Sequence, residues 1–332
     1  MKYDFQAHYP LSSMGSITQA KAIDWLVGKD DRFPPGLREL SEVQDQASRI
    51  SILTQAVGTA YKEQARIGTR GAAGGFRYWL ETTSLSFLQG RYRLLQSLGL
   101  MPAIADFGIL PPGSWAIRFD FTLRKPYLSR DDTEWYILDN PVRKDKVFGL
   151  PLVPSTGWKG ALLASIRQEK GHTSWEQEQR DEQMTRLFGN IKGEERKEAF
   201  LAGRLRFYPT FFAQLSLEVI NPHDRKAGSG SQPIYIECVP AGAKGTFSLL
   251  YLPFDMIGNK EEEINAQAGE DLQLVAQAIQ AMMLIHGFSA KRTSGYGTAE
   301  DEIENSFART QANEWKLTRL SKLPEEVADV AW

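Results

Sequence analysis

The apolar residues before residue 113 follow helical spacing. Between residues 37 and 67 no proline interrupts the chain, and apolar side chains recur at steps of three and four residues, namely Leu40, Val43, Ala47, Ile50, Leu53 and Val57. This spacing predicts an amphipathic helix, and residues 77–100 predict a second one. Glycines between residues 71 and 75 separate the two helices, and the run Pro111-Pro112-Gly113 marks a boundary.

After this boundary the spacing changes to that of strands. Residues 115–123 alternate apolar and polar side chains, which predicts a half-buried strand. A helix over 157–167, capped by Ser155 or Thr156, a strand over 204–208, a strand over 246–252, a helix over 271–286 and a last strand after residue 299 are predicted to follow. The order strand, helix, strand, strand, helix, strand is the split βαβ order of RNA-recognition domains. We therefore predict an α+β protein with a ferredoxin-like (RRM-like) βαββαβ core.

Two excursions interrupt this core. Residues 215–220 and 234–239 predict the arms of a hairpin around the Gly/Ser-rich segment 226–231, and the loop over 129–154 is too long to be a plain connection. The predicted division is a mainly helical extension over 1–110, a core domain over 114–300 with a hairpin insertion at about 210–245, and a tail over 301–332.

The composition indicates a globular protein of the cytoplasm. Of the 332 residues 42% are hydrophobic and 24% are charged, and neither a membrane-spanning stretch nor the apolar run of a signal peptide is visible. The single cysteine, Cys238, cannot form an internal disulfide, which favours a reducing compartment. The net charge of −2 argues against a generally basic coat for nucleic acid, although it can conceal local basic segments.

One basic segment surrounds the predicted helix over 157–167. Six basic residues and two acidic ones lie between 140 and 170, and Lys159 with Gly160 falls in the first turn of the helix. Free backbone N–H groups and the positive end of the helix dipole favour a phosphate at this place. A capped helix with a solvated lysine is the alternative interpretation.

A second basic segment is the glycine-rich stretch over 287–297. Its glycines allow backbone amides to approach a polyanion, Lys291 and Arg292 supply charge, and Tyr296 or Phe288 can stack on a base. A plain connection from helix to strand is the alternative interpretation.

Several motifs together resemble those of one family. Residues 151–162 (PLVPSTGWKGAL) are similar to the "P-x-I-P-G-S-S-L-K-G-x-L" signature of the RAMP superfamily, which comprises CRISPR-associated RNA-binding proteins. Residues 138–145 (LDNPVRKD) are similar to a loop of the backbone subunits of type III CRISPR effector complexes. The family's remaining motifs match 186–189 with 203–207, 233–242 and 287–297 in the same order. The resemblance covers roughly residues 114–300.

The resemblance implies a subunit of a type III CRISPR ribonucleoprotein that serves antiviral defence. Its partners would be a CRISPR guide RNA, single-stranded target RNA, other RAMP subunits and the large and small subunits of the complex, with no membrane involved. The hairpin insertion would be the family's thumb. Together with the basic segments, the resemblance implies RNA-binding roles for Lys144, Lys159, Gly160, Arg167, Arg225, Lys226, Lys291, Arg292 and Tyr296.

Carried over from the loop motif, Asp139 is the implied catalytic residue for cleavage of the target RNA. An aspartate carboxylate is a weak general base for a ribose hydroxyl, so we expect Asp139 to hold Mg²⁺ or Mn²⁺ directly or through water. The neighbouring 2′-OH would then attack the phosphate in line, which gives a 2′,3′-cyclic phosphate and a 5′-OH.

Two other functions stay open at this point. A non-catalytic scaffold or end subunit of the same complex is favoured by the long N-terminal extension and by departures from the signature such as Trp158. A guide-processing ribonuclease would instead use His223 as an acid or base. Five arginines of the extension either line an RNA path or, as we favour, are ordinary exposed helix side chains, namely Arg66, Arg70, Arg77, Arg91 and Arg93.

Overall fold

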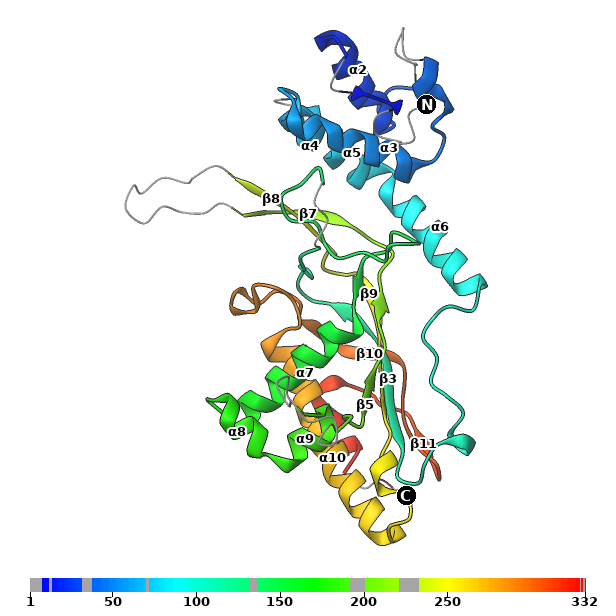
Figure 1. Cartoon of the computed structure of the whole chain (residues 1–332), viewed down its shortest axis with the longest axis vertical. Helices are drawn as coiled ribbons and strands as arrows, with labels where there is room; N and C mark the ends of the chain where they lie inside the picture. The colour runs from blue at the N-terminus through cyan, green and yellow to red at the C-terminus, as the bar shows by residue number, and fades with distance from the viewer. Residues whose placement is uncertain are drawn as a thin grey trace, which may run out of the picture. The chain divides into compact units, whose positions relative to one another are not determined.

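The computed structural model describes residues 8–11, 14–31, 38–69, 72–131, 136–190, 201–220, 233–328, 330 and 332. The chain divides into two compact units, each of which gathers segments that are distant in the sequence. Figure 1 labels their helices and strands. Within the described residues, no helix is long and apolar enough to span a bilayer.

Unit 2 contains Leu100–Tyr127, Leu152–Phe212 and Ala241–Trp332 and is built on a five-stranded antiparallel sheet. The strands follow the spatial order β11 (Glu314–Trp315), β10 (Ala299–Thr310), β3 (Trp115–Leu123), β9 (Lys244–Tyr251) and β5 (Leu205–Phe207). Helices α7 (Ser155–Glu169) and α10 (Glu261–Ala281) lie on the same side of this sheet (Figure 1). The predicted α+β class is confirmed.

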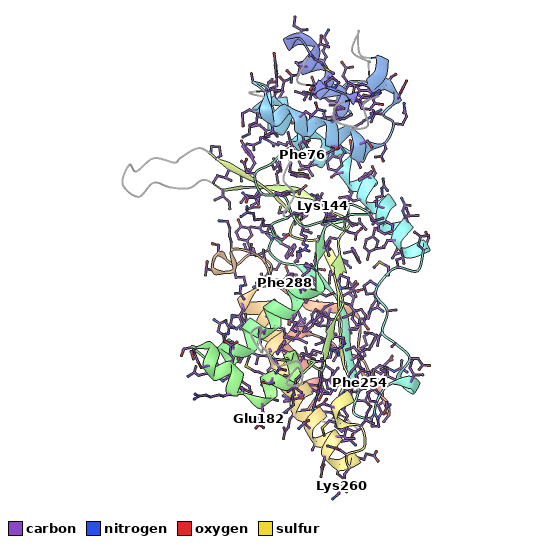
Figure 2. All side chains as sticks on the ribbon, in the orientation of Figure 1. Phe76, Lys144, Glu182, Phe254, Lys260 and Phe288 are labelled. Carbon is purple, nitrogen blue, oxygen red and sulfur yellow. The ribbon has the colours of Figure 1, made fainter. Side chains whose placement is uncertain are left out.

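Aromatic side chains fill the space between the sheet and its helices. The ring of Trp158 on α7 lies 5.0 Å from that of Phe247 on β9 and 4.6 Å from that of Phe288. Figure 2 marks Phe288, which is 7% exposed. Because Trp158 is fully buried, this departure from the signature changes the core of the protein and not its surface.

Helix α7 begins two residues earlier than predicted and without the predicted cap. Pro154 occupies the N-cap position, and its carbonyl accepts hydrogen bonds from the N–H groups of Gly157 at 2.8 Å and Trp158 at 3.1 Å. The prediction that Ser155 or Thr156 caps the helix is therefore wrong. The proline, with ψ of 156°, already holds the extended backbone from which a helix starts.

Further elements complete unit 2. They include β4 (Leu152–Val153), α8 (Trp175–Arg180), α9 (Glu182–Phe188), β6 (Thr210–Phe211), the π-helical turn Met282–His286 at the end of α10, and α11 (Leu323–Glu326). On the other face of the sheet, Phe107, Ala116, Leu250 and Leu252 form a second buried cluster. In the segment after residue 300, Leu317, Leu320 and Leu323 are fully buried.

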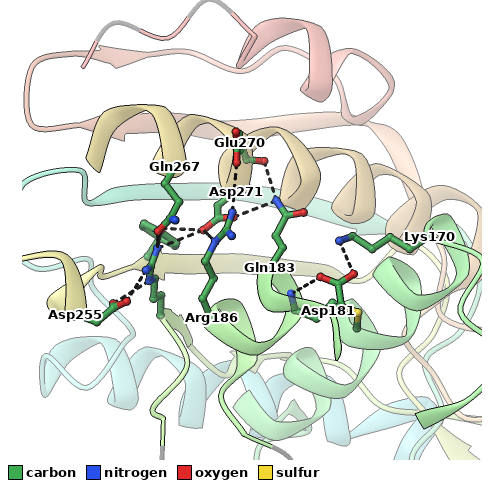
Figure 3. Close-up of polar contacts among 11 residues, drawn as sticks. Lys170, Asp181, Gln183, Arg186, Asp255, Gln267, Glu270 and Asp271 are labelled. Atoms are coloured by element: carbon green, nitrogen blue, oxygen red, sulfur yellow. Dashed lines mark hydrogen bonds and ion pairs between the residues drawn. The ribbon is translucent and has the colours of Figure 1, made fainter. Parts of the chain in front are cut away.

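A buried carboxylate, Asp271 of α10, joins three elements of unit 2 and the residue that precedes β5 (Figure 3). Arg186 of α9 donates to it from Nε at 3.0 Å and from a terminal nitrogen at 2.7 Å, and the Tyr251 hydroxyl donates at 2.8 Å. Arg204 in turn donates to the Tyr251 hydroxyl at 2.8 Å. Burial and the charge of Asp271 raise the pKa of Tyr251, so its hydroxyl stays a donor. Arg186 and Arg204, both from family-like motifs, are therefore structural cations.

Unit 1 contains Met1–Gly99, Leu128–Pro151 and Ala213–Pro240. Its helical part runs through α2 (Ser16–Leu26), η2 (Arg38–Glu42), α3 (Gln46–Leu53), η3 (Thr54–Gly58), α4 (Lys62–Ile67), the short strands β1 (Gly68–Thr69) and β2 (Ala72–Ala73), α5 (Gly75–Thr82) and α6 (Ser84–Ser97). Strands β7 (Ser216–Ile220) and β8 (Ile234–Cys238) pair antiparallel, from Ser216 opposite Cys238 to Ile220 opposite Ile234.

The prediction of one continuous helix over 37–67 is wrong. In the described residues 38–67, two α-helices alternate with 3-10 turns. The carboxylate of Asp45 accepts a hydrogen bond from the N–H of Ser48 at 2.9 Å, so a new helix begins there, and η3 ends at Gly58. An N-cap side chain inside an apolar stripe outweighs the stripe's periodicity.

The Asp271 network provides a first testable prediction. Substituting Asp271→Asn leaves half-buried Arg186 without its buried charged acceptor, so we expect the free energy of unfolding to fall by about 3–5 kcal/mol in urea titrations. Glu270→Gln is the matched control, because Glu270 is exposed and lies 3.5 Å from the same arginine. A loss below about 1 kcal/mol in Asp271→Asn would contradict the structural role.

The packing of β8 provides a second prediction. Burial, aided by the charges of Glu218 and Glu237, raises the pKa of Cys238 from 9.0 to about 12. At pH 8 the native thiol should therefore react with iodoacetamide at least about fiftyfold more slowly than in urea-unfolded chain. The same shift stabilises the fold below pH 9.0, and this contribution is lost as the pH rises to about 12. Equal native and unfolded labelling rates would show that β8 is not packed in this way.

Candidate nucleic-acid interface

The loop that carries Asp139 lies in unit 1 and is held by a buried glutamate. Glu237 of β8 has no exposed side-chain surface, and it accepts hydrogen bonds from the Tyr136 hydroxyl at 2.7 Å and from the Val142 N–H at 2.9 Å. The ammonium of Lys144 forms an ion pair with the same carboxylate (Lys144 is labelled in Figure 2). Burial and the charge of Glu237 hold the pKa of Tyr136 well above its usual value. Residues before and after Asp139 are thus fixed to the base of the β7–β8 hairpin.

Asp139 itself contacts an arginine of the N-terminal extension. One terminal nitrogen of Arg66, in the last turn of α4, forms an ion pair with Oδ1 of Asp139, and Arg66 Nε donates to the carbonyl of Ile137 at 2.8 Å. The Arg66 side chain is 8% exposed, whereas that of Asp139 is 55% exposed. The expectation that Arg66 is an exposed helix side chain is therefore wrong, while Arg77 and Arg93 are exposed as expected.

The donor set around Asp139 does not form a protein cage for a metal ion. Among the described residues no group of three or more His, Cys, Asp or Glu side chains could hold one. Mg²⁺ commonly takes one or two carboxylates and completes its shell with water and substrate phosphates. The exposed Asp139 carboxylate fits such a shared site, in which RNA would supply the other oxygens.

The glycine-rich segment 287–297 lies in unit 2 and forms a pinched loop. Phe288 N–H donates to the carbonyl of Gly297 at 2.9 Å, and Gly297 N–H donates to the carbonyl of Pro126 at 2.8 Å. Gly297 has φ of +68°, and a Cβ placed on it would lie 2.3 Å from that of Ser289. This glycine is required by the close approach of the two ends of the loop.

The tip of this loop presents positive charge to solvent. Lys291 and Arg292 are exposed, and within the described residues no carboxylate pairs with either of them. The backbone N–H groups of Arg124 and Lys125 both donate to the carbonyl of Thr298, at 2.8 and 3.3 Å, so two further exposed cations follow β3 directly beside this loop. Tyr296 is half-buried in the loop.

Lys159 has a structural contact that the sequence did not reveal. The buried face of α7 consists of Trp158, Ala161, Leu162, Ser165 and Ile166, so Lys159 and Gly160 lie on its exposed side. From there the Lys159 ammonium donates to the carbonyl of Phe188, the last residue of α9, at 2.7 Å. A cation at a helix C-terminus is favourable.

Lys159 also has a cationic neighbour, Arg206 of β5. Partial removal from water lowers the pKa of Lys159, and the charge of Arg206 lowers it further. Next to Lys159, Gly160 is exposed, and a Cβ placed on it would meet nothing within 4 Å. The surface beside the first turn of α7 therefore has two neighbouring cations, Lys159 and Arg206, and exposed backbone at Gly160.

The remaining predicted RNA-binding residues are engaged or lie elsewhere. Arg167 donates to the buried Glu178 at 2.7 Å, and Lys144 belongs to the Glu237 cluster of unit 1. Arg225 and Lys226, together with His223, lie outside the described residues. Of the predicted set, unit 2 thus holds Lys159, Gly160, Arg167, Lys291, Arg292 and Tyr296, and unit 1 holds Asp139 and Lys144.

In each unit the structure adds residues to which the sequence analysis gave no site role or, for Arg66, a different favoured role. In unit 1, Arg66 and Glu237 hold the Asp139 loop. In unit 2, Arg206, Arg124 and Lys125 add charge beside the predicted cations. The only available signal was the glutamate in the motif over 233–242, a charged residue in an otherwise apolar strand. Nothing in the spacing of residues connects Arg66 to position 139.

The chain is similar to known proteins in sequence and in structure. The chain is 27% identical over 194 residues to the CRISPR system Cms endoribonuclease Csm3 of Streptococcus thermophilus, a match that covers 56% of this chain and 84% of the relative. Among solved structures, a chain of the type III-B Cmr-beta complex bound to cognate target RNA is 15% identical with a TM-score of 0.40, covering 68% of this chain and 66% of that one. A chain of a CRISPR RNA-guided surveillance complex is 16% identical with a TM-score of 0.38, covering 57% and 67%. The RAMP superfamily matches residues 121–300, which is more than half of the chain, and the protein is therefore a member of the RAMP superfamily.

Proposed function

We propose that this protein is a subunit of a CRISPR RNA-guided effector complex and that unit 2 binds the guide RNA. The observation that carries the proposal is the loop over 287–297, where Lys291 and Arg292 are exposed without a carboxylate partner among the described residues. Exposed cations and exposed backbone N–H groups can bind the phosphates of a sugar-phosphate chain. The relative named a CRISPR system endoribonuclease supports the same class of function.

We propose the ferredoxin-like arrangement for the core that presents these residues. The spatial order β10, β3, β9, β5 supports it, because it places the first and third core strands at the centre of the antiparallel sheet. Helix α7 follows β3 and α10 follows β9, as the split βαβ order requires. The hairpin β7–β8 is the proposed thumb.

Within unit 2, the proposed RNA contacts differ in kind. Lys291 and Arg292 supply charge from a loop, and Tyr296 offers a ring for stacking. Lys159 with Arg206 forms a like-charged pair that a phosphate would stabilise, and Gly160 lets the backbone of RNA approach α7. Arg167 would contact RNA while it also pairs with Glu178. In unit 1, Lys144 would do so while it also pairs with Glu237.

We further propose type III target cleavage at the Asp139 loop. The 2′-hydroxyl of the target would lose its proton to water as its oxygen attacks the adjacent phosphorus, the bond from phosphorus to the 5′-oxygen would break, and the 5′-oxygen would take a proton from water. Asp139 would orient the nucleotide for in-line attack. Asp139 would hold Mg²⁺ or Mn²⁺, and the ion would supply positive charge that stabilises the phosphate.

A non-catalytic scaffold of the same complex is the second candidate function. The observation that favours it is the ion pair with Arg66, which engages one oxygen of the Asp139 carboxylate. For either function the proposed partners are a CRISPR guide RNA, single-stranded target RNA, other RAMP subunits and the large and small subunits, and the proposed location is the cytoplasm.

The guide-binding proposal predicts a change in salt dependence. Substituting both Lys291→Ala and Arg292→Ala removes about two phosphate contacts, so the slope of log affinity against log salt should become shallower by about 1.4 for single-stranded guide RNA. Lys244→Ala is the control, because Lys244 is exposed in the same unit but pairs with Glu304 at 2.7 Å. An unchanged slope in the double variant would contradict the proposal. Lys159→Ala is less informative, since it also removes the contact with α9.

The cleavage proposal is decided by Asp139→Ala in the assembled complex. We expect single-turnover cleavage of bound target RNA to fall by at least about 100-fold at the sites served by this subunit, with target affinity unchanged. Asp145→Ala is the control, since Asp145 lies in the same loop and its carboxylate accepts hydrogen bonds from the N–H groups of Val147 and Phe148. Retention of every cut in Asp139→Ala would favour the scaffold function.

A further inference from the structure

We infer that Arg66 is a positioning residue for Asp139, so that the N-terminal extension is part of the site and not only an attached module. Its effect on cleavage rests on the proposed function, whereas its effect on the loop does not. The family match begins at residue 121, and Arg66 lies well before it.

The geometry of Arg66 suits this role. Its Nε reaches the Ile137 carbonyl at 2.8 Å while a terminal nitrogen pairs with Asp139 Oδ1, so one planar guanidinium spans two residues of the same loop. The other terminal nitrogen lies 3.5 Å from Oε1 of Glu63, one turn earlier in α4. A rigid fork with several donors fixes direction as well as distance, which a lysine would not do.

Arg66 is placed to act through Asp139 and not on RNA directly. Its side chain is 8% exposed and its donors face protein acceptors, which leaves little surface for a phosphate. Asp139, in contrast, is 55% exposed, and among the described residues its carboxylate is contacted only at Oδ1. The ion pair thereby fixes the direction of the second oxygen, Oδ2, and leaves Oδ2 exposed to a ligand.

A second anchor makes this orientation well defined. Glu237 holds Tyr136, Val142 and Lys144, and Glu237 N–H donates to the carbonyl of Asn140 at 3.1 Å. Arg66 secures the part of the loop between those points, at residues 137 and 139. With Arg66 removed, the loop would keep its ends but lose the contact that orients the carboxylate.

Amide hydrogen exchange in the full chain tests the inference without any cleavage assay. In Arg66→Gln, and separately in Asp139→Asn, we expect residues 136–144 to exchange at least about tenfold faster than in wild type, the effect of losing at least one charged hydrogen bond. Arg91→Ala is the control, because Arg91 belongs to the same extension and pairs with Asp45 at 3.2 Å, outside this loop. It should leave the exchange of 136–144 unchanged.

The outcomes separate this inference from the cleavage proposal. Unchanged exchange of residues 136–144 in Asp139→Asn would overturn the inference. Because Asp139 is exposed, Asp139→Asn should fold and stays informative even if Arg66→Gln unfolds. In the assembled complex, Arg66→Gln should lower the single-turnover rate at least tenfold with unchanged target affinity, and adding Arg66→Gln to Asp139→Ala should cause no further loss. If Asp139→Ala cleaves normally while the exchange effect is present, cleavage at Asp139 fails and the positioning role stands.

Discussion

A fully buried carboxylate that is saturated by a cation and a tyrosine hydroxyl organises each unit of this protein. In unit 2 it is Asp271, with Arg186 and Tyr251, and in unit 1 it is Glu237, with Lys144 and Tyr136. A buried charge is tolerated only when its partners are complete, so each of these clusters fixes the elements that supply the partners. The Asp139 loop and the base of the β7–β8 hairpin cannot be placed independently for this reason.

The same requirement divides the basic residues of the chain into two groups. Some cations pair with carboxylates of the protein itself, as Arg186 and Arg204 do in the Asp271 network and Arg167 does with Glu178. Cations on the loop over 287–297 are exposed and without a carboxylate partner in the described part of the chain. Lys159 is intermediate, because it contacts both the end of α9 and the neighbourhood of Arg206. A basic residue in a family motif is therefore not in itself a contact to RNA.

The extension changes how the proposed site works. A carboxylate in an exposed loop would sample many directions, and catalysis by orientation requires one of them. The guanidinium of Arg66 supplies that restriction from a helix that lies outside the family's own domain. The same ion pair is compatible with a scaffold in which the loop has a purely structural purpose, and the two cases differ only in whether Oδ2 meets RNA.

The sequence by itself determined the features that depend on residues close together in the chain. Alternation over 115–123, the apolar face of α7 and the order of strands and helices followed from local spacing, as did the motifs over 151–162 and 287–297. The continuous helix over 37–67 failed because a capping aspartate, Asp45, outweighed the apolar period. Only the tertiary structure decided that Arg66 meets Asp139, 73 residues later, and that Glu237 takes up the charge of Lys144. Ion pairs between distant residues leave no periodic trace, because their partners are chosen by the packing of whole elements and not by spacing along the chain.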